Sequence, residues 1–167
     1  MIPGGQDVYS EARCREISAA GYRQLAEFRY RIRQFLHLSE EAARSKGIEP
    51  QQHQVLLAIK GLPEESRPTV RALSERLCLR HHSTVELIDR LVEQRAVVRR
   101  HNHQDRREVL IELTPHGEEL LHQLSVLLWQ ELKVSGPALS ESLLTVLANS
   151  AGSGRSKHGT ADASRSA

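Results

Sequence analysis

Residues 69–114 read TVRALSERLCLRHHSTVELIDRLVEQRAVVRRHNHQDRREVLIELT, and this stretch decides the fold. Apolar residues at helical spacing predict a short helix over 69–77, a turn at 78–79 and a second helix over about 81–94. The pattern then changes from helix to strand. One strand is predicted at Val97-Val98-Arg99-Arg100, and a returning strand contains Val109, Ile111 and Leu113. The predicted order is therefore two helices joined by a sharp turn, followed by a two-stranded ribbon.

The second of these helices has one apolar side and one polar side. Its apolar residues fall at i, i+3, i+4 and i+7 and are predicted to face the core: Thr84, Leu87, Ile88 and Leu91. On the polar side, His82 and Ser83 can donate or accept hydrogen bonds at base edges, and Val85 offers a methyl contact to thymine. The first turn of this helix is therefore the predicted base-reading segment.

The tip of the ribbon, residues 102–107, is polar and basic. It could lie along the narrow minor groove, whose negative potential attracts arginine, and Asp105 could hold the guanidinium of Arg107 in a fixed direction. The full set of predicted DNA-contacting residues is Arg80, His81, His82, Ser83, Val85, Glu86, Arg90, Arg99, Arg100, His103, Asp105, Arg106 and Arg107.

Charge is unevenly distributed along the chain. Residues 67–107 carry ten Arg and Lys against five Asp and Glu, a net +5, whereas residues 108–150 carry one against six, a net −5. A phosphate polyanion is the natural partner for a basic segment, because binding releases condensed counterions. With only 4% aromatic residues, stacking on single-stranded nucleic acid is disfavoured, so duplex DNA is the predicted partner.

The remaining chain divides into an arm, helices and a tail. Residues 1–15 are predicted to be a flexible arm, 16–46 a dimerisation helix, 47–114 the DNA-binding domain and 151–167 a disordered tail. Over 115–150 we expect two more dimerisation helices, because Gly136-Pro137 interrupts the pattern before a final helix over Glu141 to Ala148. The apolar stripes of the first and last helices exceed what a small head can cover, so they predict a second subunit.

Other function classes find little support. Cys14 and Cys78 are the only cysteines, and the chain has no apolar run near the roughly 18 residues of a membrane helix, which favours a cytoplasmic protein. The nine histidines do not fall at metal-ligand spacing, so no metal or other cofactor is expected. Paired carboxylates such as Glu40-Glu41 occur without a glycine-rich phosphate loop, so no enzyme activity is expected.

Four segments in order resemble the MarR family of bacterial transcriptional regulators. They are residues 69–79, residues 83–91 ending in Ile88-Asp89-Arg90-Leu91, Asp105-Arg106-Arg107, and Leu113-Thr114-Pro115-His116-Gly117. The resemblance covers roughly residues 20–148. It implies a mainly α fold with a small β-wing, that is, a winged helix-turn-helix head, and a homodimer whose first and last helices interlock.

The resemblance also implies a function. The protein is then expected to be a sequence-specific regulator, a repressor in our interpretation. A small aromatic or phenolic effector would release it from a pseudo-palindromic operator. His37 and His53 are candidates to line the effector cavity. The alternative is a winged-helix protein-interaction module that does not recognise a DNA sequence.

The sequence departs from the family pattern at two turns. Cys78 and Arg95 stand where the family usually has glycine. Each would cost about 1 kcal/mol if the backbone is left-handed there, because a Cβ is poorly accommodated in that conformation.

Overall fold

The computed structural model describes residues 17–101 and 108–152. Within these residues the chain forms helices and one two-stranded sheet, in the order α2 (Ala19–Ser45), α3 (Pro50–Lys60), α4 (Val70–Leu77), α5 (His81–Glu93), β1 (Val97–His101), β2 (Val109–Leu113) and α6 (Pro115–Gly152). The mainly helical fold with a small β-wing is therefore confirmed.

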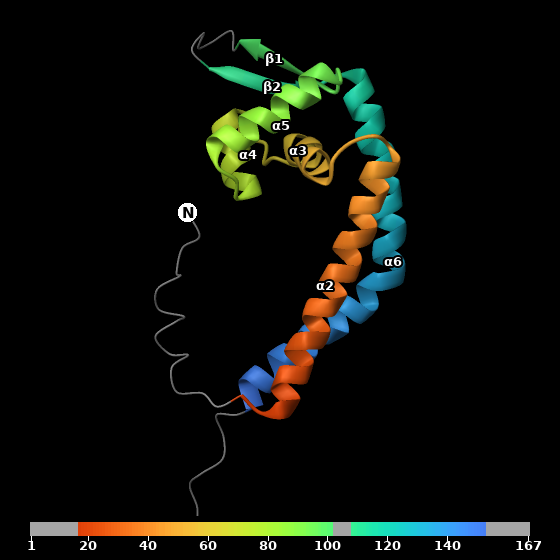
Figure 1. Ribbon diagram of the computed structural model, residues 1–167. Coiled ribbons are helices and arrows are strands. Elements are labelled where there is room, and N and C mark those ends of the chain that lie inside the picture. Colours follow the sequence, from red (N-terminus) through yellow and green to blue (C-terminus); the bar gives the residue numbers. More distant parts are fainter. Residues whose placement is uncertain (1–16, 102–107, 153–167) are drawn as a thin grey trace, which may run out of the picture.

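The molecule has a head, formed by α3, α4, α5 and the β1–β2 ribbon, and a long helical arm, formed by α2 and α6. Figure 1 shows α3, α4 and α5 gathered beneath the β1–β2 ribbon, while α2 and α6 lie side by side and extend away from them. The first and last helices are thus in contact, although almost the whole head separates them in sequence.

The boundary between arm and head is set by glycine and proline. Gly47 has φ +77°, and its N–H donates to the carbonyl of Arg44 while that of Ile48 donates to Ala43, which closes the end of α2. Helix α3 then begins with proline at its first position. Glu49 and Gln52 form a reciprocal capping box at its start, which the sequence analysis did not anticipate.

The two positions that depart from the family pattern are both left-handed. Cys78 has φ 54° and Arg95 has φ 58°. Each closes a helix in the same way as Gly47, with Leu79 N–H donating to Ser74 O at 3.0 Å and Ala96 N–H donating to Leu91 O at 2.9 Å. The expected strain condition is therefore met at both turns.

The ribbon is short and anchored to the helical head. Strands β1 and β2 pair antiparallel, with Val97 opposite Leu113 and His101 opposite Val109. Thr69, the N-cap of α4, forms an isolated bridge with Leu110, and Ile111 N–H donates to Pro68 O at 2.8 Å. These bonds fix the base of the ribbon to the start of the helix-turn-helix.

The helix α6 corrects the sequence analysis. Gly136-Pro137 was expected to end the first C-terminal helix, but α6 continues through Pro137, and Ala151 and Gly152, assigned to the tail, belong to it. A proline removes one backbone donor and bends a helix without always ending it. Here α2 packs along α6 and its Gln24 accepts a hydrogen bond from Asn149, beyond the proline. Figure 1 shows α6 changing direction along its length.

The core lies in the head and at its junction with α6. The predicted inward face of α5 is confirmed, with Thr84, Ile88 and Leu91 fully buried and Leu87 nearly so. At the start of α6, Gly117 lies against the Ala96 backbone so closely that a Cβ there would be 1.9 Å from the Ala96 carbonyl oxygen. Only glycine fits this contact, which joins the turn after α5 to the start of α6.

Candidate nucleic-acid interface

The first turn of α5 is open to solvent. Arg80 is the N-cap, but its side chain makes no capping hydrogen bond, and Arg80, His81 and His82 are all exposed. The hydroxyl of Thr84, on the buried side, donates to the Arg80 carbonyl at 3.2 Å and holds this turn in place. Unbonded N–H groups at a helix start favour a phosphate, so the turn offers both backbone and side-chain donors.

Further along α5 the predicted contact residues do not all share one face. Glu86 is exposed one turn after His82, and Val85 is half-buried between them and the core. Ser83 is also half-buried. Arg90 instead lines a hollow with Glu40 and Arg44 of α2 and the first residues of α3, so it lies on the flank of α5 nearest the arm.

Two of the predicted DNA-contacting arginines, both in β1, already have acidic partners. Arg99 Nη1 lies 2.5 Å from Asp89 Oδ1 of α5, and Arg100 Nε lies 2.8 Å from Glu112 Oε2 of β2. All four side chains are more than a third exposed, so these pairs contribute little stability. The Asp89–Arg99 pair nevertheless links α5 to the ribbon and so helps to orient one relative to the other.

The Asp89–Arg99 pair was missed by sequence reasoning. Ten residues separate the two, and they meet only because the turn at Arg95 directs β1 back along α5. The Arg100–Glu112 pair could have been found, because the ribbon register places both residues near one another on paired strands. His103, Asp105, Arg106 and Arg107, including the expected Asp105–Arg107 contact, lie outside the described residues.

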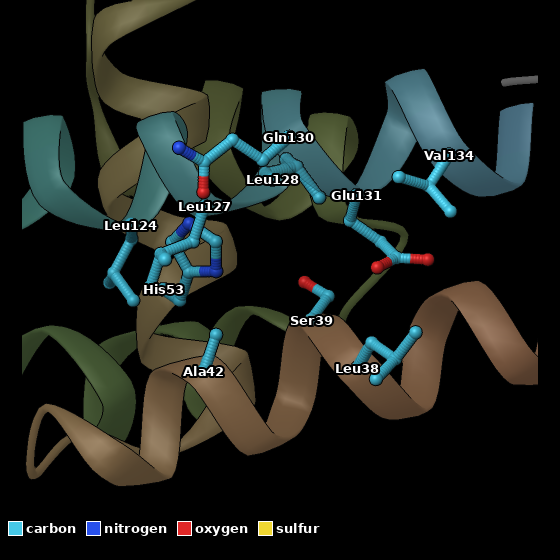
Figure 2. Close-up of a pocket in the computed structure, with 10 residues that line it drawn as sticks. All are labelled: Leu38, Ser39, Ala42, His53, Leu124, Leu127, Leu128, Gln130, Glu131 and Val134. Atoms are coloured by element: carbon cyan, nitrogen blue, oxygen red, sulfur yellow. The ribbon is translucent and has the colours of Figure 1, made fainter.

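A second feature lies behind the head, between α2, α3 and α6. It is a cavity of about 310 Å³ with mostly apolar walls, drawn in Figure 2: Leu38, Ser39, Ala42, His53, Leu124, Leu127, Leu128, Gln130, Glu131 and Val134. A volume of this size is at the small end of ligand pockets. The cavity walls come from α2 and α6 of the arm and, through His53, from α3, which in turn packs on α4 and α5.

His53 is the polar group most deeply placed in this cavity. It is 2% exposed, and its Nε2 has no hydrogen-bond partner among the described residues. Burial lowers the pKa of His53 below its usual 6.5, because an imidazolium would lose its hydration. The ring is therefore neutral at physiological pH and offers one unsatisfied hydrogen-bonding atom.

His37 lies elsewhere. Its side chain is 66% exposed on α2, 3.4 Å from Glu41, and it does not line the cavity that contains His53. The two histidines named together from the sequence are therefore not brought together.

The described part of the chain contains no group of three His, Cys, Asp or Glu side chains placed to hold a metal ion. Over the same residues, no helix combines the length and apolar character needed to cross a membrane. Cys78 is a free, exposed thiol, and Cys14 lies outside the described residues.

A family model described as the MarR family matches residues 46–108, which span α3 to the end of the ribbon's connecting segment. Comparison with curated protein sequences gave no match. The family match therefore covers the head up to the residue before β2.

Solved structures resemble the chain over most of its length. Wild-type apo MarR from E. coli is 27% identical, with a TM-score of 0.57 over 71% of this chain and 92% of that one. A mutant MepR from S. aureus bound to an oligodeoxyribonucleotide is 16% identical, with a TM-score of 0.57 over 74% and 94%. CouR from Rhodococcus jostii RHA1 bound to p-coumaroyl-CoA is 20% identical, with a TM-score of 0.57 over 70% and 80%.

Proposed function

Because this chain belongs to the MarR family of winged helix-turn-helix transcriptional regulators, we propose that it binds a specific duplex DNA sequence through the first turn of α5. One observation carries the proposal: Arg80, His81 and His82 are exposed together at the unblocked start of a helix. Such a helix start fits the major groove, and these side chains match base edges and phosphates. A structural relative, MepR, is described as bound to an oligodeoxyribonucleotide.

We propose a homodimer as the active form. Large apolar side chains remain exposed on α2 and α6 outside the His53 cavity: Tyr22, Leu25, Tyr30, Leu36, Val126, Trp129, Leu143, Leu144 and Leu147. Soluble proteins rarely leave this much apolar surface uncovered. A second copy would cover it and place two α5 helices about one DNA turn, ~34 Å, apart on a pseudo-palindrome.

The proposed activity is repression relieved by a small molecule. The His53 cavity touches α2 and α6 of the arm and α3 of the head, so a ligand there would change how the head is held on the arm. Another structural relative, CouR, is described as bound to p-coumaroyl-CoA. An operator-bound dimer whose two heads are re-spaced by a ligand would lose contacts at one half-site.

The test compares binding to duplexes from the gene's own upstream region with binding to random duplexes of equal length. Fluorescence anisotropy over a range of salt concentrations should show preference for one upstream duplex and weaker binding at higher salt. Arg80→Ala and His82→Ala should each weaken specific binding by about 1 to 3 kcal/mol. Lys60→Ala removes an exposed cation at the C-terminal end of α3, where Lys60 pairs with Glu118 of α6, and it should change specific DNA binding little.

A lack of preference for any upstream duplex, together with unchanged binding by Arg80→Ala and His82→Ala, would contradict this function. It would favour a winged-helix module that contacts a protein partner instead. Such a module needs no salt-sensitive sequence preference, so the same titration separates the two functions.

A further inference from the structure

The walls of the His53 cavity carry an unusual balance of charge. Among its lining residues, all of them described, one is a carboxylate, Glu131, and none is a lysine or arginine. Glu131 is half-buried on α6 and forms no ion pair within the described residues. In Figure 2 its carboxylate points from α6 toward α2, where the Ser39 hydroxyl rises into the same space. The cavity is therefore negative at this end.

His53 forms a second polar part of the cavity wall, and this part is uncharged and lacks a hydrogen-bond partner among the described residues. His53 is almost wholly buried, and its Nε2 faces no protein partner among the described residues. A buried polar atom without a partner is costly, so a ligand that bonds to it recovers that cost. A ligand hydroxyl or amine suits this atom, because a hydroxyl can donate or accept according to which ring nitrogen carries the proton.

An anionic ligand does not fit these walls. A carboxylate inside the cavity would share a partly dehydrated space with Glu131 and would find no cation among the lining side chains. His53 cannot supply the missing positive charge without becoming a buried imidazolium. The long apolar walls from α2 and α6, such as Leu38, Leu124 and Leu128, would instead pack against an apolar body.

We propose that the His53 cavity binds small uncharged or cationic molecules that carry a hydroxyl or amine on an apolar body, and that it rejects carboxylates of the same size. The cationic or hydroxyl group is held between His53 and Glu131, and the apolar body fills the space between α2 and α6. This rests on the proposed effector response, and it narrows the expected aromatic or phenolic effector to molecules without an acidic group.

Four one-ring probes of similar size separate charge from shape: benzylamine, benzyl alcohol, benzoate and toluene. Their affinities for the full-length protein are measured without DNA by ligand-detected NMR and calorimetry. Benzylamine and benzyl alcohol should bind at least about tenfold more tightly than benzoate, since Glu131 repels an anion in a medium of reduced dielectric constant. Benzyl alcohol should also bind more tightly than toluene.

Substitutions assign the preference to the two side chains. Glu131→Gln should weaken the binding of benzylamine relative to benzyl alcohol and narrow the affinity gap between benzylamine and benzoate. Glu119→Gln, on the same helix and outside the cavity, should change neither. His53→Phe should remove the advantage of benzyl alcohol over toluene. Thermal unfolding of each variant establishes that it is folded.

Benzoate binding as tightly as benzylamine, an unchanged order in Glu131→Gln, or no probe binding at millimolar concentration would each overturn the proposal. DNA binding is measured separately on the same samples. If the probe order holds while DNA binding is absent, the proposed regulatory function fails and the cavity assignment stands. If DNA binding holds while the order is reversed, the cavity assignment alone fails.

Discussion

At the scale of single residues, Cys78 and Arg95 hold backbone conformations that glycine adopts more easily. Both have positive φ and both are followed by a hydrogen bond that closes a helix. The Cys78 turn separates α4 from α5, and the Arg95 turn directs β1 back along α5. Strain at either position therefore lies beside the proposed DNA-reading surface.

Replacing either residue by glycine should stabilise the protein. Cys78→Gly and Arg95→Gly should each raise the free energy of unfolding by about 0.5 to 1 kcal/mol, because relief of left-handed strain exceeds the added chain entropy of glycine. Urea denaturation at fixed protein concentration measures this. Gly47→Ala is the matched control and should lower stability, because Gly47 has φ +77°. The space around its Cβ position is open, so this loss reports backbone strain and not a side-chain clash. Equal stability of all variants would contradict the strain assignment.

His53 should make stability depend on pH. Burial lowers its folded-state pKa below 6.5, so the unfolded chain binds more protons at mildly acidic pH. Stability is then full above about pH 6.5 and falls as the pH decreases from there toward the folded-state pKa. His53→Gln removes this titration, so its unfolding free energy should fall less than that of the wild type between pH 7.5 and 5.5. Parallel pH profiles would show that His53 is not the group responsible.

Among the secondary-structure elements, the ribbon and α5 are joined by the ion pair between Asp89 and Arg99. Because Arg99 has an acidic partner and Arg80 has none among the described residues, the two arginines should differ in how their removal changes the salt dependence of DNA binding. Arg80→Ala should lower the slope of log affinity against log salt concentration by about one, as expected for the loss of one phosphate contact. Arg99→Ala should leave the slope nearly unchanged. The slope is measured by anisotropy with one duplex at several salt concentrations, and equal changes in both variants would refute the distinction.

Several elements could be predicted from the sequence because their signals are local. Thr69 and Thr114 accept hydrogen bonds from the backbone N–H groups of Ala72 and Gly117 and cap the starts of α4 and α6, a role that threonine commonly takes before a helix. The inward face of α5 followed from its period alone. Contacts between distant residues did not follow, as with Asp89–Arg99, because they depend on the direction of the chain after Arg95. Pro137 was interpreted as a helix end because its local cost is visible in sequence, whereas the packing of α2 across it is not.

The candidate site was predictable to a similar extent. The exposure of His82 was expected from the amphipathic pattern of α5. The neighbours of Arg90 and Arg99 were not, because those side chains meet residues from α2 and from another part of the head. His53 and His37 look alike in sequence, yet only His53 is buried, since it lies on the face of α3 that meets the arm. Their roles in binding DNA or a ligand remain predictions.

At the scale of the whole molecule, the arm is expected to hold two copies together. Leu144 is 62% exposed on α6 and belongs to the apolar surface proposed to meet the partner. Leu144→Asp should shift the protein toward monomer and weaken operator binding, because a charge would be buried at the interface. Leu144→Met, which remains apolar, should not. Sedimentation velocity gives the oligomeric state, and a wild-type monomer would contradict the dimer.

The central claim is that α5 recognises a DNA sequence as part of a symmetric pair. Selection of bound duplexes from a random pool tests it most directly. The expected result is two inverted half-sites with centres about one helical turn, 10 to 10.5 base pairs, apart, and a changed preference within each half-site for His82→Ala. Recovery of no common sequence, or of one unaffected by His82→Ala, would contradict it.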